Sequence, residues 1–176
     1  MHVRHAILLV VALLFTAACA STLTSDIEVK TETASKANLK AYKTYAWLGS
    51  AEIVNDPKGQ WEPPEFDADA EIRYLINAAL RDKGMTEVAA NPDVLVGFAA
   101  GIDMATLEIK ENPDNKMQTL ENVPKGALVV MLVDPKTRQP VWVGEALANV
   151  QKKLPSKDVK ARLKYAVKEM FDQMKR

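Results

Sequence analysis

The densest group of side chains that could do chemistry is the acidic cluster of Asp67, Asp69 and Glu71. Carboxylates at this spacing could bind a metal ion or work as an acid–base pair. The apolar residues that follow recur at helical spacing, so the cluster falls in the first turn of a predicted helix. Acids at that position cap free N–H groups and interact favourably with the helix dipole. We therefore expect the cluster to begin a helix and not to form a metal or catalytic site.

Two other polar or glycine-containing segments are weaker candidates. Residues 112–115, Asn-Pro-Asp-Asn, offer oxygen ligands but lack the closing glutamate of a calcium-binding loop, so we interpret them as a solvated turn. Gly97 and Gly101 lie in predicted strands with no helix after them, whereas a phosphate-binding loop needs strand, glycine loop and helix in that order. The sequence therefore predicts no metal and no cofactor.

The histidines and the cysteine of the chain all lie near its N-terminus, at His2, His5 and Cys19. Removal of a signal peptide before Cys19 would leave no histidine for proton transfer at neutral pH and no Ser-His or Cys-His pair. The usual ligands of zinc, copper and haem would be missing as well. We expect a protein that is not an enzyme, and a hydrolase working with carboxylates alone is the least favoured alternative.

Residues 1–18 have the organisation of a secretory signal peptide. A basic start that contains Arg4 precedes an apolar run over residues 6–15, and small residues lead up to Cys19. The run is shorter than the roughly 20 apolar residues that a transmembrane helix needs. We expect these 18 residues to be removed on export.

The small residues before Cys19 are similar to the lipobox of bacterial lipoproteins. The resemblance implies that the Cys19 thiol receives a diacylglycerol, that a further acyl chain is added, and that Cys19 starts the mature chain. Ala20, where an aspartate is absent, implies the periplasmic face of the outer membrane. Ordinary signal peptidase cleavage is the alternative, because Ala18, Cys19 and Ala20 also form a small-x-small site. Residues 19–26 would form the lipidated cysteine and a short tether that keeps the domain near the membrane.

Residues 27–176 predict a single two-layer α+β domain of order β-β-α-β(n)-α. Amphipathic helices are expected from Asp67 to Gly84 and after a cap at Pro155 and Ser156. Strands are expected at residues 27–32, 42–48, 85–88, 94–100, 102–109, 127–133 and 141–147, and residues 51–65 and 111–126 are interpreted as loops. Because successive strands form hairpins, the sheet should be mainly antiparallel, with both helices on one face.

The three tryptophans are candidates for contact residues or core residues. Trp61 lies in a polar, proline-rich loop and is the candidate contact residue, although it could also fold back onto its own domain. Trp47, with Tyr45 on the same strand face, and Trp142 are expected to pack in the core. The 23 basic and 23 acidic residues balance, and the lysines are dispersed, which argues against nucleic acid as a partner.

Four motifs in order resemble the bacterial lipoprotein family called "domain of unknown function 4136". They are residues 42–47, the helix from Asp67 to Gly84, residues 92–96 and residues 141–144. The similarity runs from about Ile27 to the last helix. It implies an envelope location and a compact α+β domain, and the family brings no established activity with it.

The leading functional hypothesis is a membrane-anchored envelope lipoprotein that acts as a non-enzymatic binding or scaffold module for an unidentified envelope protein. The alternative is a periplasmic carrier of a small or apolar ligand held between the sheet and the helices. A deep apolar pocket would favour the carrier, whereas an exposed aromatic side chain or an open sheet edge would favour the partner-binding module.

Overall fold

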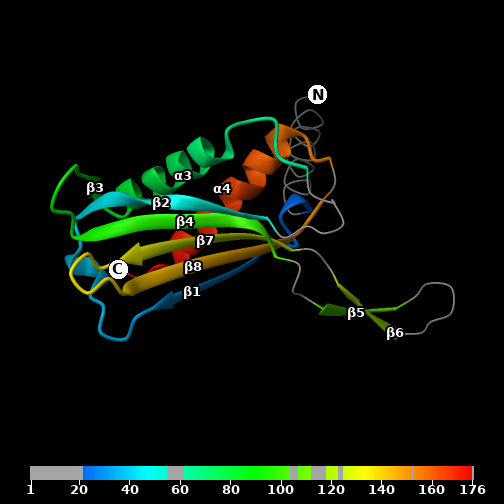
Figure 1. Ribbon diagram of the computed structural model, residues 1–176, viewed down its shortest axis with the longest axis horizontal. Coiled ribbons are helices and arrows are strands. Elements are labelled where there is room, and N and C mark those ends of the chain that lie inside the picture. The colour runs from blue at the N-terminus through cyan, green and yellow to red at the C-terminus, as the bar shows by residue number, and fades with distance from the viewer. Residues whose placement is uncertain are drawn as a thin grey trace, which may run out of the picture.

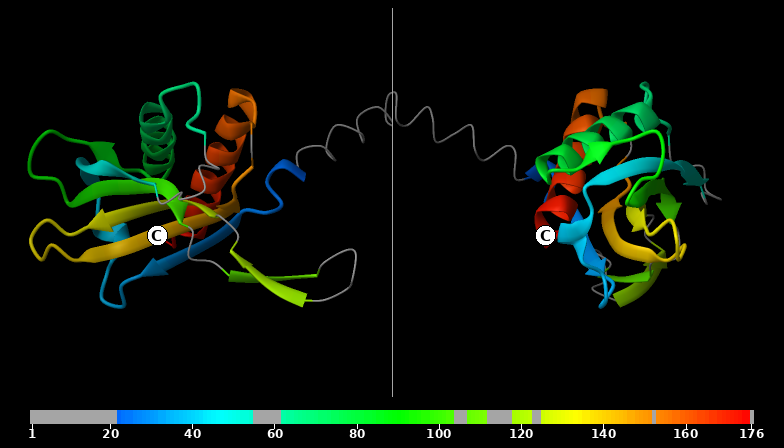
Figure 2. Two further views of the ribbon diagram at one scale, coloured as in Figure 1. Left: turned by 45° about the vertical axis from the view of Figure 1, so that its right-hand side comes forward. Right: turned by 90° about the vertical axis from the view of Figure 1, so that its left-hand side faces the viewer.

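The computed structural model describes residues 22–54, 62–103, 107–111, 118–122, 125–151 and 153–175. A six-stranded sheet forms one layer, and two helices that pack against each other form the second (Figure 1). Two further views show both helices on the same side of the twisted sheet (Figure 2). The predicted two-layer α+β architecture is confirmed.

The elements follow one another in the expected order. They are β1 (Glu28–Thr33), the 3-10 helix η1 (Leu39–Ala41), β2 (Thr44–Val54), α3 (Ala68–Asp82), β3 (Thr86–Glu87), β4 (Val94–Asp103), β5 (Leu107–Glu111), β6 (Gln118–Asn122), β7 (Lys125–Val133), β8 (Pro140–Asn149) and α4 (Ser156–Gln173).

The main sheet has the strand order β1-β8-β7-β4-β2-β3. The pairs β1–β8, β8–β7 and β7–β4 are antiparallel, whereas β2 is parallel to both β4 and β3. The parallel pairing follows from the position of α3 between β2 and β4, because a helical crossover returns the chain to the same end of the sheet. The prediction of a mainly antiparallel sheet is confirmed.

Helix α3 begins and ends where its sequence predicts. The carboxylate of Asp67 accepts a hydrogen bond from the N–H of Ala70 at 2.9 Å, and Asp69 and Glu71 lie in the first turn. The helix ends before Gly84, whose φ of 72° is a left-handed conformation that glycine adopts without strain. The acidic cluster therefore caps a helix, as expected. Helix α4 begins at the predicted Pro155–Ser156 position: Pro155 is its N-cap and Ser156 its first residue, without a side-chain capping hydrogen bond.

Asp93 ties the starts of the two central parallel strands together. Its carboxylate accepts hydrogen bonds from the N–H groups of Lys43 and Thr44 at 2.8 and 2.9 Å, and its own N–H donates to the Thr44 hydroxyl at 3.0 Å. These hydrogen bonds lower the pKa of the Asp93 carboxyl below its ordinary value. The motif at residues 92–96 therefore sets the relative position of β2 and β4.

The core fills the space between the sheet and the helices. Trp142 of β8 is 1% exposed and packs against Phe171 of α4, with ring centroids 5.1 Å apart. The ring of Trp142 also lies over Gly144, where an added Cβ would be 2.6 Å from the tryptophan ring. Tyr45 is buried and Trp47 packs against the core, so the predicted positions of these three aromatic residues are confirmed.

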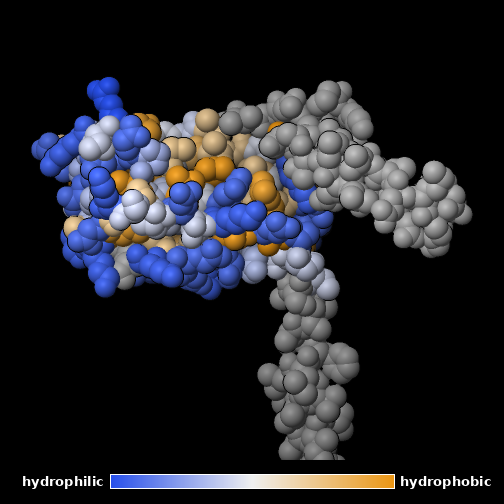
Figure 3. Space-filling view, turned by 90° about the horizontal axis from the view of Figure 1, so that it is seen from below, coloured by the Kyte–Doolittle hydropathy of each residue, from blue (hydrophilic) through white to orange (hydrophobic). Residues whose placement is uncertain are grey.

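The opposite face of the sheet carries the alternate residues and is not covered by either helix. Small and apolar side chains such as Ala99, Val129 and Val143 occupy the central strands, and Glu28 and Lys30 of β1 occupy the edge. Viewed from below, hydrophobic residues run along the domain between hydrophilic ones (Figure 3).

Two local predictions are wrong. Strand β2 continues to Val54 instead of ending at Gly49, because Gly49, with a φ of 154°, accommodates a bulge that shifts the register with β4. The sequence predicts a loop that includes residues 118–122, but these residues form β6, which pairs antiparallel with β5. This hairpin is a separate two-stranded sheet and projects from the end of the main one (Figure 1).

Candidate functional site at the tether junction

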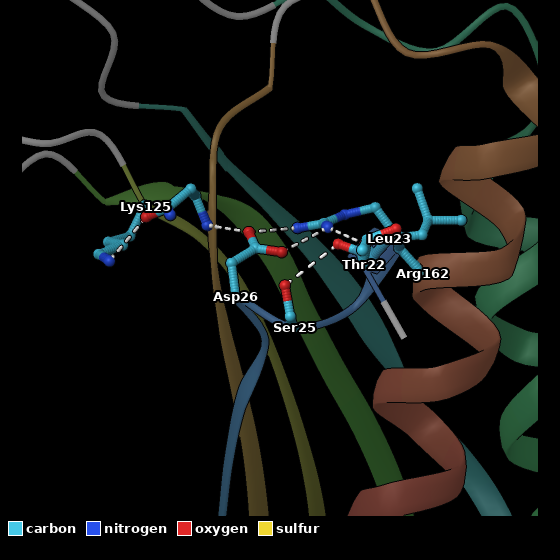
Figure 4. A network of polar contacts seen from close by, with 7 residues as sticks. Thr22, Leu23, Ser25, Asp26, Lys125 and Arg162 are labelled. Atoms are coloured by element: carbon cyan, nitrogen blue, oxygen red, sulfur yellow. Dashed lines mark hydrogen bonds and ion pairs between the residues drawn. The ribbon is translucent and has the colours of Figure 1, made fainter. Parts of the chain in front are cut away.

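A polar junction joins the residues before β1 to helix α4 (Figure 4). The two terminal nitrogens of Arg162 donate to the two carboxylate oxygens of Asp26 at 2.7 and 2.8 Å. Arg162 also donates to the carbonyl oxygen of Leu23, and Asp26 accepts from the N–H of Asn149 at 3.0 Å. The chain at Leu23 and Asp26, just before β1, is therefore fixed to both α4 and the end of β8.

The junction is largely shielded from solvent. The side chains of Arg162 and Asp26 are 10% and 16% exposed. The hydrogen bond from Arg162 lowers the pKa of Asp26, burial acts in the opposite direction, and the guanidinium charge lowers it further. A bidentate arginine–carboxylate pair of this kind has a defined geometry. It holds the tether at one place on the domain surface.

The sequence interpretation missed this junction. Arg162 lies within the apolar stripe of α4, between Val159 and Ala166, where a solvated arginine is not expected. The position of Arg162 in this stripe is the sequence signal that could have identified it as a buried, paired residue. Its partner Asp26 is 136 residues away, so only the fold could identify the pair.

Beside the junction, a groove of about 1090 Å³ lies between the sheet and the starts of both helices. Its lining includes Ile27 and Arg162, so the groove and the tether junction share side chains. Apolar residues from the sheet and from both helices form much of the wall: Phe66, Ile72, Phe98, Ile102, Leu128, Val159, Leu163 and Ala166.

Lys160 connects the two helices at this end of the domain. Its ammonium group is 2.9 Å from the Glu71 carboxylate and lies 4.8 Å from the centre of the Phe66 ring. Phe66 lines the groove, so Lys160 supports that wall from the outside. A cation over an aromatic face is stabilising in addition to the ion pair.

The charged residues that line the groove are mainly acidic. They are Glu62, Glu65, Asp67, Asp69, Lys153 and Arg162. Asp69 pairs with Arg73 at 2.6 Å and Arg162 pairs with Asp26. Among the described lining residues, the remaining charges are thus three carboxylates and one lysine, which favours positive charge at the groove.

A second surface surrounds the outer edge of β2. The Tyr45 hydroxyl and the Trp47 indole N–H both donate to the side-chain oxygen of Asn77, at 2.8 and 3.2 Å, and attach α3 to β2. Burial raises the pKa of the Tyr45 hydroxyl. The guanidinium of Arg73 lies 4.6 Å from the centre of the Trp47 ring.

Beyond Tyr45, the outer edge of β2 has no strand partner among the described residues, because β3 pairs only with Thr44 and Tyr45. Two large hydrophobic side chains are exposed on the elements that form this edge. Leu48 of β2 is 59% exposed and Tyr74 of α3 is 65% exposed. The candidate contact residue Trp61 and the candidate lipid-attachment residue Cys19 lie outside the described residues.

Within the described ranges, no cluster of three or more Asp, Glu, His or Cys side chains could hold a metal ion. No helix in those same ranges has the length and apolar character needed to cross a bilayer.

A family model described as "Domain of unknown function (DUF4136)" matches residues 29–174. No curated protein matches the sequence.

Solved structures with TM-scores above 0.5 share the fold at low sequence identity. A DUF4136 family protein from Bacteroides thetaiotaomicron is 16% identical with a TM-score of 0.53, and the match covers 84% of this chain and 95% of that one. A PDZ domain protein from Parabacteroides distasonis is 16% identical with a TM-score of 0.51; the match covers 90% of this chain but only 39% of that longer protein. PelC from Paraburkholderia phytofirmans, a dodecamer, is 13% identical with a TM-score of 0.46, over 84% of this chain and 99% of that one.

Proposed function

The chain belongs to the DUF4136 family, and we propose that it is a lipid-anchored, non-enzymatic module that binds a protein partner in the bacterial cell envelope. The observation that carries the proposal is the part of β2 beyond Tyr45, which has no strand partner among the described residues, together with the exposed side chains of Leu48 on β2 and Tyr74 on α3. An unpaired strand edge binds an extended segment through main-chain hydrogen bonds, and neighbouring apolar side chains add specificity.

The anchor in this proposal is Cys19, exposed by removal of residues 1–18 and carrying the acyl chains. Ala20 supports the periplasmic face of the outer membrane. Arg162 fixes the chain at Leu23, so four residue steps separate the lipid from the domain, at most about 14 Å when fully extended. Two or more acyl chains make such an anchor stable where one is marginal.

The structural roles of the acidic cluster of Asp67, Asp69 and Glu71 support the proposal that the protein is not an enzyme. Asp67 caps α3, Asp69 pairs with Arg73, and Glu71 pairs with Lys160. Each carboxylate therefore has a structural role that stabilises the start of the helix.

The partner surface can be tested by site-specific photocrosslinking in intact cells. We expect photoreactive residues at Leu48 and Tyr74 to give one common adduct, and a photoreactive residue at the exposed turn position Thr137 to give none. Leu48→Glu should abolish the adduct formed at position 74 without changing the amount of protein in the membrane fraction. Identical adducts from all three positions, or an adduct that persists in Leu48→Glu, would rule out this edge as the partner surface.

The anchor is tested separately by metabolic labelling with palmitate. Wild type should be labelled and Cys19→Ala should not, and equal labelling of both would refute the anchor. Trp61→Ala in the crosslinking strain tests the remaining contact residue. Unchanged adducts would exclude Trp61 from the partner surface.

A further inference from the structure

We propose that the groove between the sheet and the starts of α3 and α4 holds an acyl chain of a lipid whose head group carries an amine. The groove borders β2 at Ser50 and Ala51, but Leu48 and Tyr74 of the proposed partner surface do not line it. This inference rests on the proposed function only in placing the groove beside a membrane. The groove itself is formed by described residues of the domain.

The size and shape of the groove follow from the residues of the sheet at this end. On the helix-facing side, β4 carries Ala100 and β8 carries Ala146 and Ala148 near the groove. Towards the other end of the same layer, large side chains such as Leu132 and Trp142 fill the space beneath the helices. Small residues therefore leave a hollow at one end of a layer that is closely packed at the other.

An acyl chain matches the wall of this hollow. Pockets for small molecules measure about 300–1000 Å³ and have mostly apolar walls. The groove volume of about 1090 Å³ is slightly above that range. Phe98, Ile102 and Leu128 line the groove but are already nearly buried. The apolar contact comes mainly from the partly exposed side chains of Phe66, Val159 and Leu163. On binding, the acyl chain and the groove wall would both bury apolar surface that water contacts before. This burial is the driving force for binding.

The position of the groove favours a lipid over a water-soluble ligand. Ile27 and Arg162 belong both to the groove and to the place where the tether joins the domain. With Cys19 in the membrane, the tether length places this end of the domain at the bilayer surface. A lipid would therefore move only a short distance from the membrane into the groove.

The charges at the groove select the head group. Two charged residues of the described lining, Asp69 and Arg162, are each paired with an opposite charge. The unpaired negative charges of Glu62, Glu65 and Asp67 then outnumber the single positive charge of Lys153. An anionic head group would be repelled, whereas an amine would pair with one of these carboxylates. The occupant is therefore expected to resemble phosphatidylethanolamine and not phosphatidylglycerol.

The test uses the mature chain produced with Cys19→Ala, so that no attached lipid competes. The probes are lysophosphatidylethanolamine and lysophosphatidylglycerol with the same acyl chain, each titrated below its micelle concentration and followed by calorimetry and native mass spectrometry. We expect one saturable lysophosphatidylethanolamine site per chain. Lysophosphatidylglycerol should bind at least several-fold more weakly.

Two variants on one strand test the location. Ala100→Trp should fill the groove and weaken binding at least tenfold, whereas Ala99→Trp, on the opposite face of β4, should bind within about twofold of wild type. Leu163→Glu is the second groove variant if Ala100→Trp does not fold, as judged by circular dichroism. Equal binding by a folded groove variant and by Ala99→Trp would overturn the site.

Charge variants test the head-group selection. Glu62→Gln with Glu65→Gln should reduce the preference for lysophosphatidylethanolamine, whereas Asp82→Asn with Glu87→Gln, the same charge change away from the groove, should not. Absence of saturable binding, or equal binding of both lipids by wild type, would overturn the proposal. Wild type that is acylated at Cys19 and excludes the added lipid would also overturn it, by identifying the protein's own acyl chain as the occupant.

Discussion

Replacing Arg162 with methionine tests whether the tether junction stabilises the domain. The variant keeps most of the volume of the side chain but removes the guanidinium that holds Asp26 and Leu23. Three hydrogen bonds are lost, and the Asp26 carboxylate keeps only the N–H of Asn149 as a partner. The substitution therefore leaves a poorly solvated negative charge behind.

The expected loss follows from this burial. Removing one partner of a fully buried ion pair costs about 3–5 kcal/mol, and an exposed pair contributes about 0–1 kcal/mol. Because the side chains of the pair are 10% and 16% exposed, we expect a loss of about 2–4 kcal/mol in the free energy of unfolding.

The assay is urea denaturation of the mature chain with Cys19→Ala, followed by circular dichroism. Lys168→Met is the matched control, since Lys168 lies on the same helix in a pair whose side chains are 63% and 56% exposed. We expect it to lower the free energy of unfolding much less than Arg162→Met does, because the charges of an exposed pair are screened by solvent. Equal losses for Arg162→Met and Lys168→Met would refute the interpretation of the junction as a buried, stabilising pair.

The same pair has a predictable pH dependence. Because the pKa of Asp26 is lowered from its ordinary value of 3.8, its contribution is present above that value and is lost as the pH falls through the lower, folded-state pKa. The difference in unfolding free energy between wild type and Asp26→Asn should therefore shrink in acid below 3.8. A difference that grows in acid would contradict the assigned direction.

Three further substitutions test the packing and the caps. Gly144→Ala would place a methyl group 2.6 Å from a core tryptophan ring and should cost about 1–3 kcal/mol, whereas Gly126→Ala, whose nearest neighbour would be 3.8 Å away, should lower the melting temperature much less. Asp67→Ala removes the α3 cap and should cost about 1 kcal/mol in urea denaturation. Asn77→Leu leaves the Tyr45 hydroxyl without its acceptor and should cost about 1–3 kcal/mol. Adding Tyr45→Phe should recover part of that loss, and a fully additive double variant would argue against the hydrogen bond.

Local sequence signals were sufficient to predict where α3 begins and ends. The capping acid Asp67, an apolar stripe of helical period and the closing Gly84 act within a few residues of one another, and the structure has each in its expected role. The mainly antiparallel sheet followed from the hairpin between β7 and β8 for the same reason.

Features that depend on distant pairing could not be derived in this way. Strand β6 is defined by its register with β5, and Gly49 looks like the end of a strand until β4 is known to continue beside it. The partners of Arg162 and the hollow beside Ala100 depend on which residues of separate strands and helices lie side by side. The exposure of Leu48 and Tyr74 likewise became apparent only from the packed structure, whereas Trp61 stays a prediction.

The Arg162 junction also determines how a pulling force would enter the domain. A load applied through the N-terminus would reach the start of β1, an edge strand whose only strand partner is β8, and could peel that strand from the sheet. With Arg162 holding Leu23 and Asp26, the load instead passes first into α4, whose buried residues are anchored in the core. In the proposed lipid-anchored protein, the guanidinium would therefore carry such a load into α4 before it reached the β1 edge of the sheet.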